Sequence, residues 1–149
     1  MKELKVSAIQ SGTVIDHIQS DYTLKVVDIL DLRDMKEVVS VVWNLPSSDF
    51  GKKGMIKIGG KNLTEDEVNK IALIAPDATM NIIKNYEVVK KINLTPPEKI
   101  EKIIKCSNPK CITNKEGVKT VFYLVDTKPM TVRCHYCERC MMDDEIVLI

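Results

Sequence analysis

The sequence predicts an α+β protein of two parts: an antiparallel sheet carrying two helices, then a small β-rich module that holds the cysteines. Strand-like apolar runs alternate with two segments of helical periodicity over residues 4–92. Pro96 and Pro97 then punctuate the chain, and all five cysteines follow them. We therefore expect one domain over residues 1–96 and a second over residues 97–149.

The first half of the sheet domain is predicted from periodicity and turn residues. Residues 4–9 alternate as a half-buried strand, which Ser11-Gly12 ends. A helix is expected from Tyr22 to about Asp31, where apolar residues recur at helical spacing. The valine-rich segment 36–45 predicts a central strand, and residues 51–58 predict the next one.

A capping box marks the second helix, because Thr64 is followed three residues later by Glu67. Pro76 ends that helix, and residues 78–84 and 86–92 predict two more strands. The order strand, helix, strand, strand, helix, strand, with one extra strand, is the split βαβ pattern. The first domain is therefore predicted to be a ferredoxin-like sandwich, with both helices on one face of the sheet.

The cysteines form two short pairs, Cys106-x4-Cys111 and Cys134-x2-Cys137. Zinc binds four thiolates tetrahedrally, and four protein ligands leave no open position, so this spacing indicates a structural zinc. Such a short module needs a metal to fold, because its own core is small. Buried or disulfide-bonded cysteines are the alternative. We expect Cys140 to be a spare thiol.

Composition restricts the function further. The chain has 149 residues and a formal net charge of +1, which disfavours binding of long nucleic acids through their phosphates. Its sequence lacks a nucleophile elbow, a Walker loop and a zincin helix, so a binding protein is favoured over an enzyme. Residues after Met1 alternate instead of forming an apolar leader, and we expect a cytoplasmic protein.

Two polar clusters are candidates for a binding site. Asp16 and His17 are adjacent in an apolar run, where they form either a recognition pair or a turn cap beside a surface histidine. Lys53 and Lys57 share one face of a strand, where they either bind an anion or solvate an edge strand.

The last two predicted strands carry further candidates. Asn81 and Ile83 share one face, as do Tyr86 and Val88, but Lys91 is out of phase with Tyr86. Simple alternation cannot bring all of them to one site without a bulge or turn. The residues alone therefore predict no more than a basic pocket beside an aromatic ring.

Several unrelated motifs occur in one order along the chain: residues 12–18, 44–47, 63–68, 75–79 and 85–89, and the four-cysteine pattern. Together they resemble the regulatory chain of aspartate carbamoyltransferase. The resemblance covers nearly the whole sequence. It implies a non-catalytic chain with a ferredoxin-like allosteric domain and a zinc domain, acting in pyrimidine biosynthesis.

The resemblance also implies ligands and partners. In that family the first domain binds CTP as feedback inhibitor, UTP alongside it and ATP as competing activator, and it pairs with a second regulatory chain. The positions implied for nucleotide binding are Ala8, Ile9, Val14, Asp16, His17, Lys53, Lys57, Asn81, Ile83, Tyr86, Val88 and Lys91.

For the second domain the resemblance implies one zinc per chain and docking on the catalytic chain. The implied ligands are Cys106, Cys111, Cys134 and Cys137, and the implied partner contacts include Asn108 and Glu138. Two other functions compete with this one. A zinc-ribbon nucleic-acid-binding protein would show affinity that falls steeply with salt. A small phosphate-handling enzyme would use His17 as acid or base.

Overall fold

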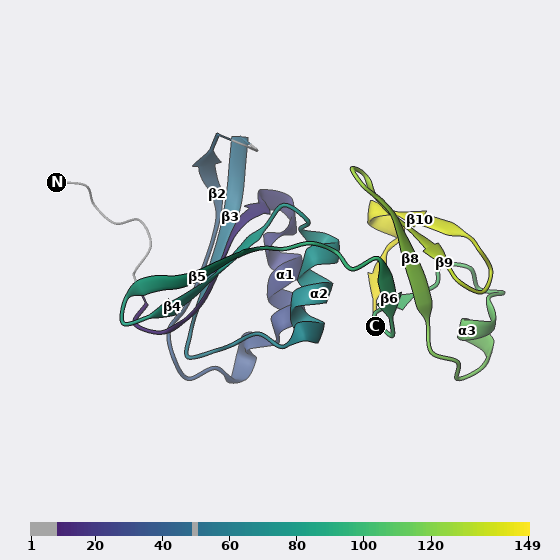
Figure 1. Ribbon diagram of the computed structural model, residues 1–149, viewed down its shortest axis with the longest axis horizontal. Coiled ribbons are helices and arrows are strands. Elements are labelled where there is room, and N and C mark those ends of the chain that lie inside the picture. Colours follow the sequence, from purple (N-terminus) through teal and green to yellow (C-terminus); the bar gives the residue numbers. More distant parts are fainter. Residues whose placement is uncertain (1–8, 49–50) are drawn as a thin grey trace. The chain divides into compact units, whose positions relative to one another are not determined.

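The computed structural model describes residues 9–48 and 51–149. The chain divides into two compact units, residues 1–95 and residues 96–149 (Figure 1). Each unit has its own sheet and its own buried residues. Within the described residues, none of the helices has the length and apolar character needed to cross a membrane.

The first unit contains a five-stranded antiparallel sheet in the order β2-β3-β1-β4-β5. Its elements are β1 (Gly12–Gln19), η1 (Ser20–Tyr22), α1 (Thr23–Leu30), η2 (Leu32–Asp34), β2 (Val39–Ser47), β3 (Gly51–Gly59), α2 (Glu65–Ile74), β4 (Thr79–Lys84) and β5 (Glu87–Asn93). Strand order and element order together confirm the predicted ferredoxin-like sandwich with one extra strand.

One strand prediction needs correction, and another lies almost wholly outside the described residues. The strand predicted over residues 36–45 was expected to be central, but among the described residues β2 lies at an edge of the sheet and pairs with β3 alone. Pro46 fits this position, because an edge strand can lose one backbone donor. The strand predicted over residues 4–9 lies outside the described residues except for Ile9, which precedes β1, and β1 itself occupies the centre of the sheet.

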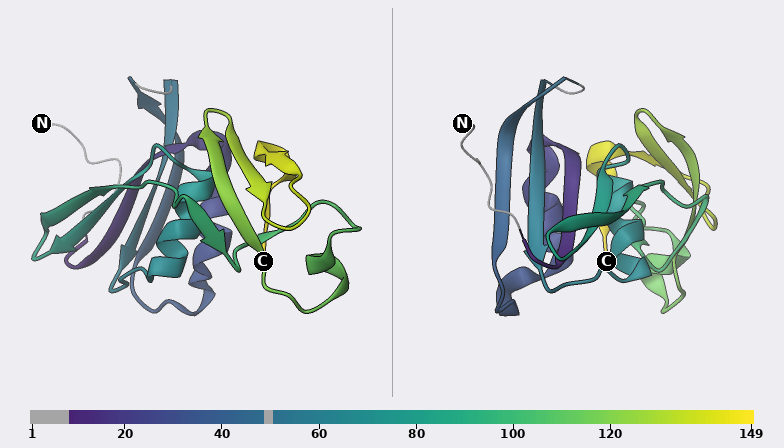
Figure 2. Two further views of the ribbon diagram at one scale, coloured as in Figure 1. Left: turned by 45° about the vertical axis from the view of Figure 1, so that its right-hand side comes forward. Right: turned by 60° about the vertical axis from the view of Figure 1, so that its left-hand side comes forward.

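Both helices pack against one face of the sheet, where they lie side by side (Figure 2). The buried residues of this core include Ile15, Ile18, Val26, Leu30, Ile56, Ile58, Ile71, Ala72 and Met80. The predicted capping box is present, since the Glu67 N–H donates to Thr64 Oγ1 at 3.2 Å and the Thr64 N–H donates to Glu67 Oε1 at 3.1 Å. Of the helices described in the first unit, neither α1 nor α2 lies on the opposite face of the sheet.

The second unit is β-rich, as predicted. It contains β6 (Lys99–Glu101), β7 (Ile104–Lys105), α3 (Ile112–Lys115), β8 (Val121–Thr127), β9 (Met130–Cys134), β10 (Cys140–Met142), η3 (Asp143–Glu145) and β11 (Val147–Leu148). Strands β10-β9-β8-β6 form one sheet, and β11 pairs with β7. Phe122, Val132 and Met141 are fully buried, but the module is small, so a metal would add much of its stability.

Candidate functional site

A β-bulge in β1 places Asp16 and His17 on the sheet face that lacks helices. Ile15 pairs with Ile56 and Ile18 pairs with Gly54, so two residues of β1 stand opposite one residue of β3. His17 adopts a left-handed backbone conformation with φ of 59°. The bulge lets Ile18 return to the helix-covered core, while both polar side chains stay on the open face.

Asp16 and His17 each have a partner on a neighbouring strand. Lys53 Nζ on β3 lies 3.0 Å from Asp16 Oδ1 and 3.1 Å from Asp16 Oδ2. His17 Nδ1 lies 3.1 Å from Oγ1 of Thr79 on β4, which is hydrogen-bond distance. The pair is therefore built into three adjacent strands, and all four side chains are partly or fully buried.

Lys53 and Lys57 lie on this same open face, because they alternate regularly along β3. Lys57 stands opposite Val14 on one side and Ser40 on the other. Strand β3 is internal, so the interpretation of these lysines as edge-strand solvation is wrong. Half-buried ammonium groups on an internal strand are suited to binding an anion.

Alternation called for a bulge or a turn to bring the candidates on the last two predicted strands to one site, and a bulge is present between β4 and β5. Ile82 pairs with Lys90 and Ile83 pairs with Val88, so Val89 is the extra residue. Asn81 pairs with Lys91 on the far side of the bulge. Asn81, Ile83, Val88 and Lys91 consequently share the open face, although Val88 and Lys91 are three positions apart.

A small apolar cluster forms the floor of this face. It consists of Ile9, Val14 and Ile83, with Met55 packed against them. Tyr86 lies in the turn between β4 and β5, where its N–H donates to the Gln10 carbonyl at 2.9 Å and its side chain is 66% exposed. We call this surface, with its lysines, Asp16 and His17, the sheet-face site. Ala8 lies outside the described residues.

Sequence reasoning missed two residues of the sheet-face site, Met55 and Thr79. Met55 had a usable signal, because it lies midway between Lys53 and Lys57 and shares their face. Thr79 had none, since its contact with His17 depends on the register of β1 against β4.

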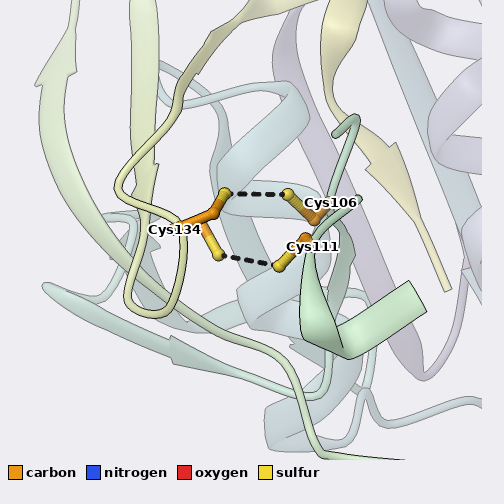
Figure 3. A group of neighbouring side chains, drawn as sticks. Cys106, Cys111 and Cys134 are labelled. Carbon is orange, nitrogen blue, oxygen red and sulfur yellow. Dashed lines mark hydrogen bonds between the residues drawn. The ribbon is translucent and has the colours of Figure 1, made fainter. Parts of the chain in front are cut away.

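The second unit brings together the four cysteines that the spacing selected. The sulfur atoms of Cys106, Cys111, Cys134 and Cys137 all lie within 4.8 Å of one another. The sulfur atoms of Cys106 and Cys137 are 3.7 Å apart. Those of Cys111 and Cys134 are also 3.7 Å apart (Figure 3). Tetrahedral zinc with bonds of about 2.3 Å requires sulfur atoms about 3.8 Å apart. The donor set therefore fits a closed, structural zinc.

Local hydrogen bonds hold the two cysteine turns in shape. Asn114 Nδ2 donates to the carbonyls of Cys106 and Asn108, at 2.9 and 2.8 Å. In the other turn Glu138 has φ of 61°, and its N–H donates to the Cys134 carbonyl at 3.0 Å. These bonds shape the backbone of the two turns that carry the cysteines.

Burial makes two of the four thiols weakly acidic. Burial raises the pKa of Cys106 to about 12 and also raises the pKa of Cys134. Burial acts on Cys137 in the same direction, but hydrogen bonds from the Arg139 backbone and the Asn108 side chain outweigh it and lower the Cys137 pKa to about 7. Four thiolates this close require a compensating positive charge, which a divalent metal supplies.

Both units match known families. Residues 4–95 match the family described as aspartate carbamoyltransferase regulatory chain, allosteric domain, and residues 98–147 match its metal binding domain. This chain belongs to the aspartate carbamoyltransferase regulatory chain family. The resemblance drawn from the sequence motifs is thereby confirmed.

Relatives of this regulatory chain match it from end to end. The aspartate carbamoyltransferase regulatory chain of Pyrococcus horikoshii is 55% identical over 149 residues, which are 99% of this chain and 98% of the relative. That of Pyrococcus abyssi is 52% identical over the same length and shares of both chains. A bacterial relative, from Parabacteroides distasonis, is 44% identical over 147 residues, covering 99% of this chain and 96% of its own length.

Membership in the family decides three sequence predictions. The chain is a regulatory rather than a catalytic subunit, its first unit is an allosteric domain, and its second unit carries one structural zinc on four cysteines. Cys140 lies outside the four-cysteine cluster, and its side chain is exposed. Of the implied partner contacts, Asn108 is half-buried in the first cysteine turn and Glu138 is exposed in the second.

Proposed function

We propose that the sheet-face site of this regulatory chain binds CTP, UTP and ATP, and that their occupancy is transmitted to catalytic chains of aspartate carbamoyltransferase. One observation carries the proposal. Two bulges, in β1 and in β5, bring basic, acidic and apolar side chains from four strands onto one open sheet face. Apart from Ala8, which lies outside the described residues, and Tyr86 in the adjoining turn, the positions that the family resemblance implied for nucleotides lie on this face.

Each part of a nucleoside triphosphate has a matching group on that face. The ammonium groups of Lys53, Lys57 and Lys91 suit a polyphosphate, which carries several negative charges. Asp16 can accept a hydrogen bond from a ribose hydroxyl, and the neighbouring imidazole of His17 can meet ribose or phosphate. Ile9, Val14, Ile83 and Val88 offer an apolar surface to a base, with Tyr86 and Asn81 beside it.

The regulatory effect follows from differential binding. CTP and ATP would compete for the sheet-face site and act in opposite directions, with UTP binding alongside CTP. An effector shifts a two-state partner only if it binds the two states with different affinity. We therefore expect opposite coupling free energies for CTP and ATP at one site.

The two domains would divide this work. Residues 1–96 would form the nucleotide-binding allosteric domain and pair with a second regulatory chain. Residues 97–149 would contact the catalytic chain through the cysteine turns, including Asn108 and Glu138. Zinc would hold both turns in one orientation, and a reducing cytoplasm would keep its thiolate ligands from forming disulfides.

Calorimetric titration of CTP, and then ATP, into the zinc-loaded chain tests the nucleotide site. Saturable binding of CTP that ATP competes away supports the proposal. A folded, zinc-replete chain that binds neither nucleotide contradicts it. A second experiment tests the contact with the catalytic chain. Glu138→Gln should weaken co-elution with the catalytic chain while the zinc content stays at one per chain. Glu116→Gln, which also removes one exposed acid, is the control.

A further inference from the structure

The sheet-face site contains its own counter-ion. Lys53 Nζ lies 3.0 and 3.1 Å from the two oxygens of the Asp16 carboxylate, and the two side chains are only 18% and 15% exposed. Asp16 Oδ1 also accepts a hydrogen bond from the His17 N–H at 2.7 Å. The bulged backbone therefore holds the carboxylate against the lysine.

This ion pair affects any anion that approaches the site. An anion that binds Lys53 must displace a carboxylate that is already at hydrogen-bond distance, or share the ammonium with it at the cost of charge repulsion. Asp16 is thus both a candidate ribose acceptor and a competitor for one of the phosphate-binding cations.

The competition has different consequences for short and long phosphate chains. A single phosphate that approaches Lys53 is held by no other lysine, so it competes with the Asp16 carboxylate as a separate molecule. A longer chain that is already held by Lys57 or Lys91 presents its remaining phosphates to Lys53 at high effective concentration. It can therefore displace the carboxylate where an isolated phosphate cannot.

We propose that Asp16 is a specificity-determining residue whose ion pair with Lys53 makes the sheet-face site select triphosphates over shorter phosphates. The inference rests on the proposed nucleotide function and deepens it. It assigns Asp16 a role toward phosphate in addition to the ribose contact proposed for it.

Tripolyphosphate and pyrophosphate are the probes, because they lack ribose and base and so leave the ribose role of Asp16 out of the measurement. Asp16→Asn keeps the size of the side chain and an oxygen that can accept from the His17 N–H. Loss of the competing pair should tighten tripolyphosphate binding by about fivefold. The affinity for pyrophosphate should increase by a larger factor. The ratio of tripolyphosphate affinity to pyrophosphate affinity should therefore fall toward one.

Asp66→Asn is the matched control. Asp66 forms an i,i+4 ion pair with Lys70 on α2, 3.3 Å apart, and its side chain is 64% exposed. The substitution changes net charge by the same amount away from the site, and it should leave both affinities unchanged. Unchanged or weaker tripolyphosphate binding by Asp16→Asn would overturn the inference, because it would mean that Asp16 positions Lys53 for the ligand.

A second comparison separates the ion pair from general repulsion. In a Lys53→Met background, Asp16→Asn should give no gain in tripolyphosphate affinity, since no lysine remains to be released. A gain that persists there would mean that Asp16 only repels the anion, and the inference would fail. Asp16→Ser, whose hydroxyl can also accept from the His17 N–H, replaces Asp16→Asn if that variant melts early or loses zinc.

CTP binding by the unchanged chain distinguishes this inference from the proposed function. If CTP binds but Asp16→Asn gains no affinity for tripolyphosphate, only the role of Asp16 is overturned. If the folded chain and its variants bind neither CTP nor tripolyphosphate, both proposals fail together.

Discussion

His17 on β1 and Thr79 on β4 are linked across the sheet, with Nδ1 and Oγ1 3.1 Å apart. His17 is the bulged residue with a left-handed backbone, and Thr79 is 7% exposed, so the contact fixes the imidazole from a rigid neighbouring strand. The orientation of His17 in the sheet-face site depends on this contact.

Thr79→Val should therefore weaken nucleotide binding without unfolding the chain. Valine has nearly the same shape as threonine but lacks the hydroxyl, so the imidazole loses one hydrogen bond. Loss of about 1 kcal/mol corresponds to CTP binding about fivefold weaker. Calorimetric titration of CTP measures this, and a CTP affinity equal to that of the unchanged chain would show that the ring does not meet the ligand.

Thr23→Val should stabilise the first unit. The Thr23 side chain is fully buried between α1 and β3, and its hydroxyl has no hydrogen-bond partner in the described structure. Removing an unsatisfied buried hydroxyl should raise the free energy of unfolding by about 1 kcal/mol. Scanning calorimetry of the zinc-loaded chain gives the change in melting temperature.

Thr64→Val provides a control of opposite sign for Thr23→Val. The Thr64 hydroxyl accepts from the Glu67 N–H in the α2 capping box. Its removal should lower the free energy of unfolding by about 1 kcal/mol. If Thr23→Val lowers the melting temperature as Thr64→Val does, the assignment of the Thr23 hydroxyl as unsatisfied is wrong.

Lys57→Ala should weaken CTP binding and the effector response while leaving zinc content intact. Lys57 is half-buried on the open face of an internal strand, beside the apolar floor of the site. Loss of a charge-assisted hydrogen bond to phosphate should weaken CTP binding by about tenfold.

Lys52→Ala is the control for Lys57→Ala. Lys52 is exposed, and its side chain alternates with those of Lys53 and Lys57 along β3. The substitution therefore removes the same charge from the other face of the strand. Its CTP affinity should stay within about twofold of the unchanged chain. Equal loss in both variants would indicate a general electrostatic effect of net charge instead of a contact.

Local signals allowed much of this structure to be predicted. The capping box of Thr64 and Glu67 lies within one helical turn, and each cysteine pair lies within a few residues, so the sequence alone specifies them. The order of the elements then indicates the fold class, because few topologies join two helices and five strands in that order.

Non-local geometry explains what sequence reasoning missed. The valines of residues 36–45 favour a strand but do not say which strands flank it, and β2 proved to be at an edge. Whether Lys53 and Lys57 lie on an edge strand or an internal one depends on the same pairing. Alternation called for a bulge or a turn if Tyr86 and Lys91 were to share a site, but it did not say which or where, since a bulge at Val89 is defined only by the register against β4.

Zinc removal should unfold the second unit selectively. Cys111→Ser replaces one ligand of a cluster whose sulfur atoms lie within 4.8 Å of one another, and serine is a poor zinc ligand. The variant should lose zinc, and the amide signals of residues 96–149 should collapse in a proton–nitrogen correlation spectrum. Signals of the first unit should persist, because its core is formed entirely by its own residues.

Cys140→Ser is the matched control for this experiment. Cys140 is exposed and lies outside the cluster, so its replacement should leave one zinc per chain and an unchanged spectrum. Zinc loss in Cys140→Ser would show that Cys140 takes part in ligation and would contradict the four-ligand assignment. If Cys111→Ser keeps CTP affinity but no longer co-elutes with the catalytic chain, then the first unit binds the effector and the zinc module carries the contact, because only the latter depends on the metal.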